Sequence, residues 1–326
     1  MPETAHAIGV DVGGTTISAI AVASDGSVIH RVNEPSEIGS WQRVLAAATR
    51  TTRKALAEVK WDDSGLLGIG FGVPGNIRRD GTCGIAPNLT DQSDYPIREK
   101  LQEQFSSPVK VVNDVNAAAF GEFTFGAGQG VSNFLMITIG TGIGGGVIVD
   151  SQLQYGPSGS AGEIGHMTVE PYGPQCTCGN HGCLEALAAK NAIIRRAAAK
   201  LEAGRKSSLT ETAGSNFSSL NPAMIAHAAS NGDVVASETL EETGIAIGIA
   251  LANVVALLDP DRIAIGGGIA SAGELLFEPI RKTVAQRNTF SEFAPCQIMP
   301  AALGNNAGAI GAAALAIEAV RTQEEQ

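Results

Sequence analysis

The first quarter of the chain alternates between runs with a strand pattern and runs with a helical pattern. Residues 7–11 and 16–22 are β-like runs that a Gly-Gly-Thr turn joins into a hairpin. Residues 41–60 place apolar side chains at helical spacing. Residues 66–73 are apolar throughout and end at a Pro-Gly pair, which indicates a strand that is buried on both faces.

The middle of the chain contains a second hairpin of the same kind. A short apolar strand at 109–112 leads into a helix that the pattern predicts at 116–125. Residues 134–140 and 145–150 then form a strand, a glycine turn and a second strand, as the opening hairpin does. Because only the pattern recurs, the repeat hints at two lobes of similar construction.

The last part of the chain is rich in helices. Residues 184–258 are rich in alanine and read as helical, apart from a polar interruption at 204–222. The longest apolar stretch, 244–258, is too short to span a bilayer, so we expect a buried core helix and no membrane partner. A strand that enters a glycine turn at 262–268 and a small-residue helix at 307–322 complete an alternation typical of an α/β fold.

Length and composition limit the classes of function. A chain of 326 residues suggests two domains. The apolar content of 44% excludes a disordered chain, and the 40 glycines, well above an average usage of about 7%, lack the period of three of collagen. A net charge of −11 argues against nucleic acid as a partner. Residues 1–7 have no signal-peptide pattern, so we expect the protein in the cytoplasm.

Three glycine-rich turns are candidate phosphate sites. They lie at 11–16, 140–146 and 266–268, and each follows an apolar strand. Backbone N–H groups in such turns can approach phosphate oxygens, threonine hydroxyls add donors, and the carboxylate of Asp11 can hold a hydrated Mg²⁺. The alternative is that the glycines only permit tight hairpins. A strand follows the first two turns, so neither matches a P-loop or a dinucleotide fingerprint, and we expect a phosphate clamp between two hairpins.

A cysteine and histidine cluster indicates metal binding. His166, Cys176, Cys178 and Cys183 offer three thiolates and one imidazole within 18 residues, a set that suits a closed tetrahedral Zn²⁺ site. Since all four positions would be filled, the zinc is predicted to be structural rather than catalytic. The alternative is a loop with buried thiols. An odd number of cysteines, five in all, does not describe a disulfide framework.

Three carboxylates are candidates for chemistry on a hydroxyl substrate. Asp114 follows a short strand, at the edge where ligands of α/β proteins usually lie, and could accept a proton from a hydroxyl as its oxygen attacks phosphorus. The alternative is an ordinary helix N-terminal residue. Glu163 and Glu185 flank the metal loop and could accept hydrogen bonds from a polyhydroxylated ligand, or could be surface acids. His166 could bind zinc through one ring nitrogen and the ligand through the other.

An ordered set of motifs extends over nearly the whole chain and resembles the ROK family of sugar kinases and repressors. The motifs are Asp11-Val12-Gly13-Gly14-Thr15, Gly72-Val73-Pro74-Gly75, Pro87-Asn88-Leu89, Asn113-Asp114-Val115-Asn116, Gly140-Thr141-Gly142-Ile143-Gly144-Gly145, Glu163-Ile164-Gly165-His166, the three-cysteine loop with Leu184-Glu185, Gly266-Gly267-Gly268 and Gly304-Asn305-Asn306.

The resemblance implies a two-lobed, actin-like ATPase fold with the sugar bound between the lobes. The smaller lobe is expected at 1–115 with 306–326, and the larger lobe at 116–305. The resemblance also implies that Asp114 is the catalytic base. The residues that match the family's sugar contacts are Gly75, Asn88, Asn113, Asp114, Glu163, His166 and Glu185. Those that match its nucleotide and phosphate contacts are Asp11, Gly13, Gly14, Thr15, Thr16, Thr141, Gly142, Gly144, Gly145, Gly267 and Gly268.

The activity implied by the resemblance is transfer of the γ-phosphate of ATP to the 6-hydroxyl of D-glucose, with Mg²⁺ and a structural Zn²⁺, in a homodimer or higher homo-oligomer. N-acetylmannosamine, N-acetylglucosamine and fructose remain alternative substrates, because Asn76 stands at a position that varies among substrate classes. A sugar-sensing repressor is the second alternative, although Asp11 lies too near residue 1 to leave room for an N-terminal helix-turn-helix. A metallohydrolase is the third, and the filled ligand set argues against it.

Overall fold

The computed structural model describes residues 6–214, 217, 219–288 and 295–324. The chain divides into two compact units. The first unit contains residues 1–132, 146–162 and 302–326, and the second contains residues 133–145 and 163–301. These compact units divide the chain at other places than the expected lobe boundaries near residues 115 and 305. The two lobes stay a prediction.

The first unit is built on a five-stranded sheet with the order β3-β2-β1-β4-β5. Strands β1 (His6–Val12), β2 (Thr16–Ala23) and β3 (Val28–Pro35) are antiparallel, while β4 (Gly68–Val73) and β5 (Val109–Asn113) run parallel to β1. The predicted opening hairpin and both apolar strands are therefore confirmed. Strand β3 escaped the sequence analysis because most of its side chains are exposed or half-buried, so it lacks an apolar run.

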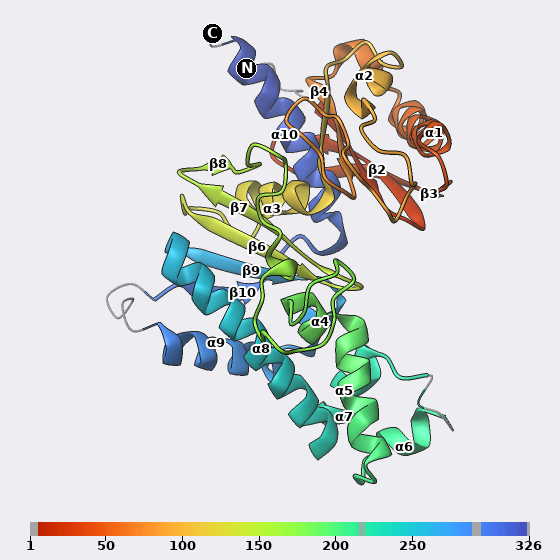
Figure 1. The fold of residues 1–326 in the computed structure, drawn as a ribbon. Helices are drawn as coiled ribbons and strands as arrows, with labels where there is room; N and C mark the ends of the chain where they lie inside the picture. The colour runs from red at the N-terminus through yellow and green to blue at the C-terminus, as the bar shows by residue number, and fades with distance from the viewer. Residues whose placement is uncertain (1–5, 215–216, 218, 289–294, 325–326) are drawn as a thin grey trace. The chain divides into compact units, whose positions relative to one another are not determined.

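Helices cover both faces of this sheet (Figure 1). On one face, α1 (Trp41–Val59) buries its apolar stripe against alternate residues of β1, beginning with Ile8 and Val10. Ser40 caps this helix by accepting a hydrogen bond from the amide of Arg43. On the other face lie α10 (Ala307–Glu324) and α3 (Asp114–Phe125). The short helix α2 (Ile97–Gln102) and the 3₁₀ turns η1 (Asp63–Gly65) and η4 (Gly304–Asn306) connect these elements.

Glycines let α10 approach the sheet and α3 more closely than any other residue would allow. A Cβ atom on Gly9 or Gly70 would lie 1.8 Å from a backbone carbonyl oxygen of α10. A Cβ on Gly311, within α10, would lie 1.7 Å from the carbonyl oxygen of Ala117 in α3. Since real atoms cannot approach to such distances, these three positions require glycine. Part of the glycine excess therefore serves packing rather than phosphate turns.

The second unit contains three parallel strands, β6 (Phe134–Ile139), β9 (Arg262–Gly266) and β10 (Gln297–Pro300), with β9 between the other two. The division between the units passes through β7 (Ile143–Val149), which pairs with the short strand β8 (Gln152–Leu153). The remaining elements are η2 (Ile164–His166), α4 (Leu184–Ala188), α5 (Lys190–Glu202), α6 (Leu209–Thr212), α7 (Pro222–Ser230), α8 (Val234–Leu258), η3 (Gly268–Ala272) and α9 (Glu274–Arg287).

Helix α8 is long and apolar enough to cross a membrane by those two criteria alone. Most of its apolar window is buried inside the second unit, where it packs against α9, α7, α4 and α5. Gly244 and Gly248 allow this approach, since a Cβ at either would lie within 2.6 Å of a side-chain atom of α9. The prediction of a buried core helix at 244–258 agrees with this packing.

Candidate functional site

Strands β1, β4 and β5 bring their carboxyl ends to one edge of the first unit's sheet. Asp11 pairs with Gly72 across β1 and β4, and Val73 pairs with Asn113 across β4 and β5. Gly72 lies next to the start of the helix that follows β5, since a Cβ there would be in ordinary contact, 3.5 Å, with the Cα of Asp114. The carboxyl edge of parallel strands is the usual ligand position in α/β proteins.

The carboxyl group of Asp11 lies at the start of α10. A Cβ on Gly308, in the first turn of that helix, would be 3.2 Å from an oxygen of Asp11. Burial and, to a smaller extent, the negative charge of Asp114 together raise the pKa of Asp11 to about 6. Two carboxylates therefore meet at this edge, in an environment that favours a cation or a proton between them.

Asn113 and Asp114 form the start of α3. The side-chain oxygen of Asn113 accepts hydrogen bonds from the amides of Val115 (2.9 Å) and Asn116 (3.0 Å), so Asn113 is the helix N-cap. Its amide nitrogen donates to Oδ1 of Asp114 (3.0 Å) and to the carbonyl of Gly75 (3.1 Å). Oδ1 of Asp114 also accepts from the amide of Val115. These bonds fix the orientation of the Asp114 carboxylate.

Gly75 has a φ of 117°, a conformation that favours glycine, and a Cβ there would lie 2.4 Å from the carbonyl oxygen of Ile85. The tight turn brings the segment that contains Asn88 back toward the sheet edge. A Cβ on Gly14 would be in ordinary contact, 3.7 Å, with the carbonyl oxygen of Asn88. Asn76, next to Gly75, donates to the hydroxyl of Ser160 at 2.7 Å.

The first phosphate turn is held by bonds that leave its outer residues accessible. The amide of Gly13 donates to the carbonyl of Thr16 (3.0 Å), which closes the turn between β1 and β2. Ser36 donates its hydroxyl to the carbonyl of Gly13 and its amide to the carbonyl of Thr15 (3.0 Å). Gly14, Thr15 and Thr16 are exposed, so their N–H and hydroxyl groups can reach a ligand.

In the second unit, the other two glycine turns lie side by side. Thr138 of β6 pairs with Gly266 of β9, so both strands enter their turns at the same level. Gly267 has a φ of 87°, and a Cβ there would lie 2.3 Å from the carbonyl oxygen of Ile139. Of the predicted phosphate contacts, Thr141, Gly267 and Gly268 are exposed, Gly142 and Gly144 are half-buried, and Gly145 is buried.

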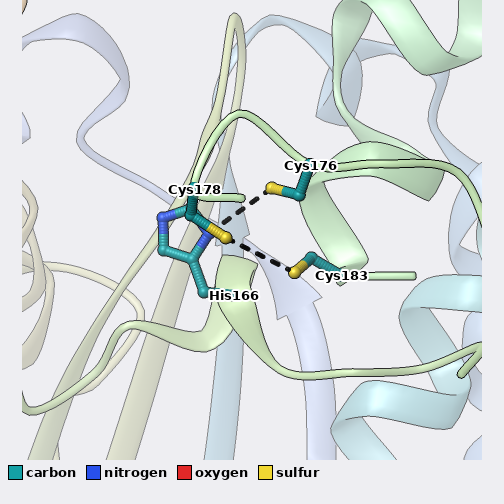
Figure 2. Close-up of side chains that lie close together, drawn as sticks. All are labelled: His166, Cys176, Cys178 and Cys183. Carbon is teal, nitrogen blue, oxygen red and sulfur yellow. Dashed lines mark hydrogen bonds between the residues drawn. The ribbon is translucent and has the colours of Figure 1, made fainter. Parts of the chain in front are cut away.

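The predicted metal ligands converge in the second unit. Figure 2 shows His166 and the three cysteines pointing toward one another. Their ligand atoms all lie within 4.8 Å of one another. Sγ of Cys178 is 3.7 Å from Sγ of Cys183, and Sγ of Cys176 is 3.7 Å from Nδ1 of His166. Tetrahedral Zn²⁺ with bonds of about 2.3 Å would hold two sulfurs about 3.8 Å apart, so the four atoms fit the ion.

Glycines shape the loop that carries these ligands. Gly182, with a φ of 67°, passes so close to Glu170 that a Cβ would lie 1.5 Å from its carbonyl oxygen. Gly179 has a φ of 94° and closes the turn that begins at Cys176, by a hydrogen bond of 3.0 Å to that residue's carbonyl. The loop can therefore fold around the cluster only with glycine at these two positions.

Glu185 and Glu163 flank the cluster, as predicted. Oε2 of Glu185 accepts from the amide of Ile143 (3.0 Å), and Oε1 accepts from the hydroxyl of Thr177 (3.2 Å) and lies 4.0 Å from Sγ of Cys176. Glu185 thus connects the metal loop to the 140–145 turn. On His166, Nδ1 lies 3.7 Å from Sγ of Cys176 while Nε2 lies 4.0 Å from Oε2 of Glu163, and the two roles expected of this ring stay a prediction.

The predicted site residues are divided between the two units. The first unit contains Asp11, Gly13, Gly14, Thr15, Thr16, Gly75, Asn88, Asn113 and Asp114. The second contains Thr141, Gly142, Gly144, Gly145, Glu163, His166, Cys176, Cys178, Cys183, Glu185, Gly267 and Gly268.

Glu122 is a supporting residue that the sequence analysis missed. Its fully buried carboxylate accepts hydrogen bonds from the amides of Ala127 (2.8 Å), Ala302 (3.0 Å) and Leu303 (2.6 Å). It therefore fixes the segment that leads into α10, whose first turn lies against Asp11. No sequence signal could have found it, because two of its partners lie about 180 residues away.

Comparison with known proteins identifies the family. The ROK family pattern matches residues 7–319. The chain belongs to the ROK family. A glucokinase of Streptomyces coelicolor is 35% identical to it over 95% of this chain and 97% of its own length. A xylose repressor of Caldicellulosiruptor bescii is 33% identical over 95% of this chain, which corresponds to 77% of the repressor.

A solved ROK structure confirms the fold. The ROK glucokinase of Streptomyces griseus, in complex with glucose and AMPPNP, is 35% identical in sequence and superimposes with a TM-score of 0.81. The superposition covers 96% of this chain and 99% of that structure. The expected α/β, actin-like ATPase fold of the ROK kinases is thereby confirmed.

Proposed function

We propose that this ROK protein is an ATP-dependent glucokinase that phosphorylates the 6-hydroxyl of D-glucose. The observation that carries the proposal is the sheet edge of the first unit, where Asn113 orients Asp114 beside Asp11 and next to an exposed Gly-Thr turn. The glucokinase relatives at about 35% identity support sugar phosphorylation, and the glucose and AMPPNP complex supports glucose and ATP as the substrates.

Asp114 acts as the general base. Its carboxylate accepts the proton of the sugar hydroxyl, the hydroxyl oxygen forms a bond to the γ-phosphorus, and the bond from that phosphorus to the β-γ bridging oxygen breaks to release ADP. The hydrogen bonds to Asn113 and Val115 hold one carboxylate oxygen in place. Proton acceptance by a positioned side chain typically contributes about 10²- to 10⁴-fold to the rate.

Asp11 would help to hold Mg²⁺ beside the phosphates. Its donor type fits, because Mg²⁺ prefers oxygen ligands and usually binds through one or two carboxylates together with substrate phosphates. Burial and the charge of Asp114 raise the pKa of Asp11 to about 6, and a bound cation would favour its charged form. The ion would neutralise negative charge on the transferred phosphoryl group, while the exposed amides of Gly14 and Thr15 would bind its oxygens.

The metal loop would present the sugar-binding groups. Each carboxylate oxygen has two lone pairs, so Glu163 and Glu185 can accept sugar hydroxyls even where they already accept one protein hydrogen bond. Nε2 of His166 would meet the sugar while Nδ1 stays on the structural zinc. Removal of the ion would let these three side chains move, because the loop carries all of them.

A sugar panel tests the proposal. Phosphoryl transfer from ATP with Mg²⁺ is measured in a coupled assay on glucose, N-acetylmannosamine, N-acetylglucosamine and fructose, and polyphosphate is tried as an alternative donor. We expect glucose to give the highest kcat/KM. A higher value for another of these sugars would replace glucose as the substrate, and no transfer to any of them would refute the kinase assignment.

Asp114→Asn tests the role of the base. We expect it to lower kcat by at least 10²-fold and to change glucose binding by less than about tenfold, because the amide keeps the shape but cannot accept the proton. Asp91→Asn, at an exposed carboxylate of the same unit, is the control and should retain full activity. An Asp114→Asn enzyme with more than a tenth of the wild-type rate would show that another group takes the proton.

The xylose repressor relative makes a sugar-responsive DNA-binding protein the second candidate. The net charge of −11 disfavours contact with a phosphate backbone. A mobility-shift experiment with and without glucose separates the two candidates. The cytoplasmic location and the homodimer stay predictions.

A further inference from the structure

The first unit contains a pocket at the opposite end of its sheet from Asp114. The pocket has a volume of about 480 Å³ and is lined by the loop after β4, by α2, by the start of β5 and by the last turns of α10. Lys110, near the start of β5, projects into it, and Asp114 follows the end of the same strand. At about 3.3 Å per residue the two positions are about 13 Å apart, so this pocket is separate from the catalytic edge.

Three cations converge on this pocket. Arg79, Arg98 and Lys110 all line it. Two of them make cation–π contacts with the ring of Tyr155. Nζ of Lys110 lies 5.6 Å from the ring centroid, and Cζ of Arg79 lies 5.8 Å from it. Small side chains of α10, Ala316 and Ala319, leave the space in front of these groups open.

Two acids lie nearby and do not balance the three cations. Asp80, also at the pocket, uses Oδ1 to accept the amide of Thr82 at 2.8 Å. Glu318, on the exposed side of α10, acts electrostatically on Lys110 and on Tyr155. Three positive and two negative groups leave the cluster with a positive charge, in a chain whose net charge is −11. This local excess of positive charge therefore needs an explanation of its own.

Lys110 is the least favourably placed of the three cations. Burial lowers its pKa, and repulsion from Arg98 and Arg79 lowers it further, while Glu318 acts in the opposite direction. A protein gains nothing from desolvating an ammonium group beside two guanidinium groups unless an anion completes the cluster. Guanidinium groups are suited to phosphate in particular, because their planar N–H forks match two of its oxygens.

We propose that this pocket, formed by Arg79, Arg98 and Lys110, binds a small phosphate-bearing anion. Its volume lies in the range of small-molecule sites and accommodates a ligand as large as a hexose monophosphate. Arg79 and Arg98 are exposed, and Nε of Arg98 donates to the carbonyl of Asp80 at 2.8 Å, whereas Lys110 and Tyr155 form a half-buried wall. The inference does not depend on the proposed kinase activity.

Titration calorimetry at low ionic strength, where such interactions are least screened, tests the proposal. The probes are inorganic phosphate and a hexose 1-phosphate, added to the full chain. We expect Arg79→Gln and Lys110→Met each to weaken binding by about tenfold, and Glu318→Gln to tighten it by about threefold. Arg43→Gln removes one exposed positive charge elsewhere in the first unit and should leave the affinity unchanged.

The outcomes separate the possible ligands from the absence of a site. Tighter binding of the hexose 1-phosphate than of inorganic phosphate supports a phosphate ester as the occupant, and equal binding supports free phosphate. If Lys110→Met fails to fold, Arg79→Gln still tests the site, since Arg79 lies on the surface. The proposal is overturned if wild-type protein binds neither probe below about 10 mM, or if Arg79→Gln and Lys110→Met bind as wild type does.

Discussion

Glu122 offers a sharp test of how the first unit is held together. Its carboxylate accepts three backbone hydrogen bonds, one at Oε1 from Leu303 and two at Oε2 from Ala127 and Ala302. Glu122→Gln replaces one oxygen with an amide group that can only donate. The cheaper arrangement places the new nitrogen at the Oε1 position, where the amide of Leu303 then loses its acceptor.

The loss of stability in Glu122→Gln follows from the number of hydrogen bonds lost. A lost hydrogen bond to a charged group that leaves a buried N–H unsatisfied costs about 2–3 kcal/mol, and the opposite orientation of the amide would cost two such bonds. We therefore expect Glu122→Gln to lower the free energy of unfolding of the first unit by about 2–3 kcal/mol. With a urea dependence of about 2 kcal/mol per molar, the midpoint should fall by about 1 M or slightly more.

Tryptophan fluorescence can follow this unit alone, because both tryptophans of the chain, Trp41 and Trp61, belong to it. Glu99→Gln, an exposed substitution on α2, is the control and should change stability by less than about 0.5 kcal/mol. We also expect kcat/KM to fall in Glu122→Gln, since the 302–303 segment leads to the helix start beside Asp11. A stability change no larger than that of the control would refute the assignment of Glu122 as a clamp.

Three further results are expected. Cys178→Ser should lose zinc and sugar phosphorylation together, by metal analysis and coupled assay, and an active zinc-free variant would contradict the role given to the loop. Because the folded pKa of Asp11 is raised, the contribution of this residue to stability is most favourable below pH 4 and is lost as the pH rises to about 6. Asp11→Asn in metal-free buffer should therefore stabilise the unit by about 2–3 kcal/mol at pH 7.5 while abolishing activity. Equal stability of the wild type and the variant at that pH would contradict the raised pKa. Gly311→Ala should destabilise by more than 2 kcal/mol through its clash with Ala117, whereas Gly65→Ala, with open space around it, should not; equal urea midpoints would contradict the close packing of α10.

The sequence predicted the local features of the site well because each depends on residues that are close together in the chain. The apolar strand before Asn113 and Asp114, the Gly-Thr turns and the cysteine spacing can all be recognised without knowing the fold. The prediction that His166 and Cys176 lie in one cluster also needed only a short loop, and the structure places their side chains 3.7 Å apart.

The features that the sequence did not reveal depend on distant partners. Gly9 and Gly70 resemble ordinary strand glycines until α10, about 300 and 240 residues further along, is packed against them. An isolated glycine inside a strand pattern can indicate such an approach, and the small-residue helix at 307–322 was the matching signal. Helix α9 was missed for a local reason, since Pro279 interrupts its helical pattern.

The position of α10 also sets the order in which the protein can mature. The first unit draws its sheet from the beginning of the chain and one of its covering helices from residues 307–324. A ribosome therefore has to synthesise the entire second unit before Gly9 and Gly70 can meet their partner helix, and until then only α3 is available to cover that face of the sheet. Domains made from contiguous segments can fold as they emerge, but here Asp11 acquires its native surroundings among the last events of synthesis. A nascent chain halted within the second unit would carry Asp11 and Asp114 without the helix that completes their surroundings.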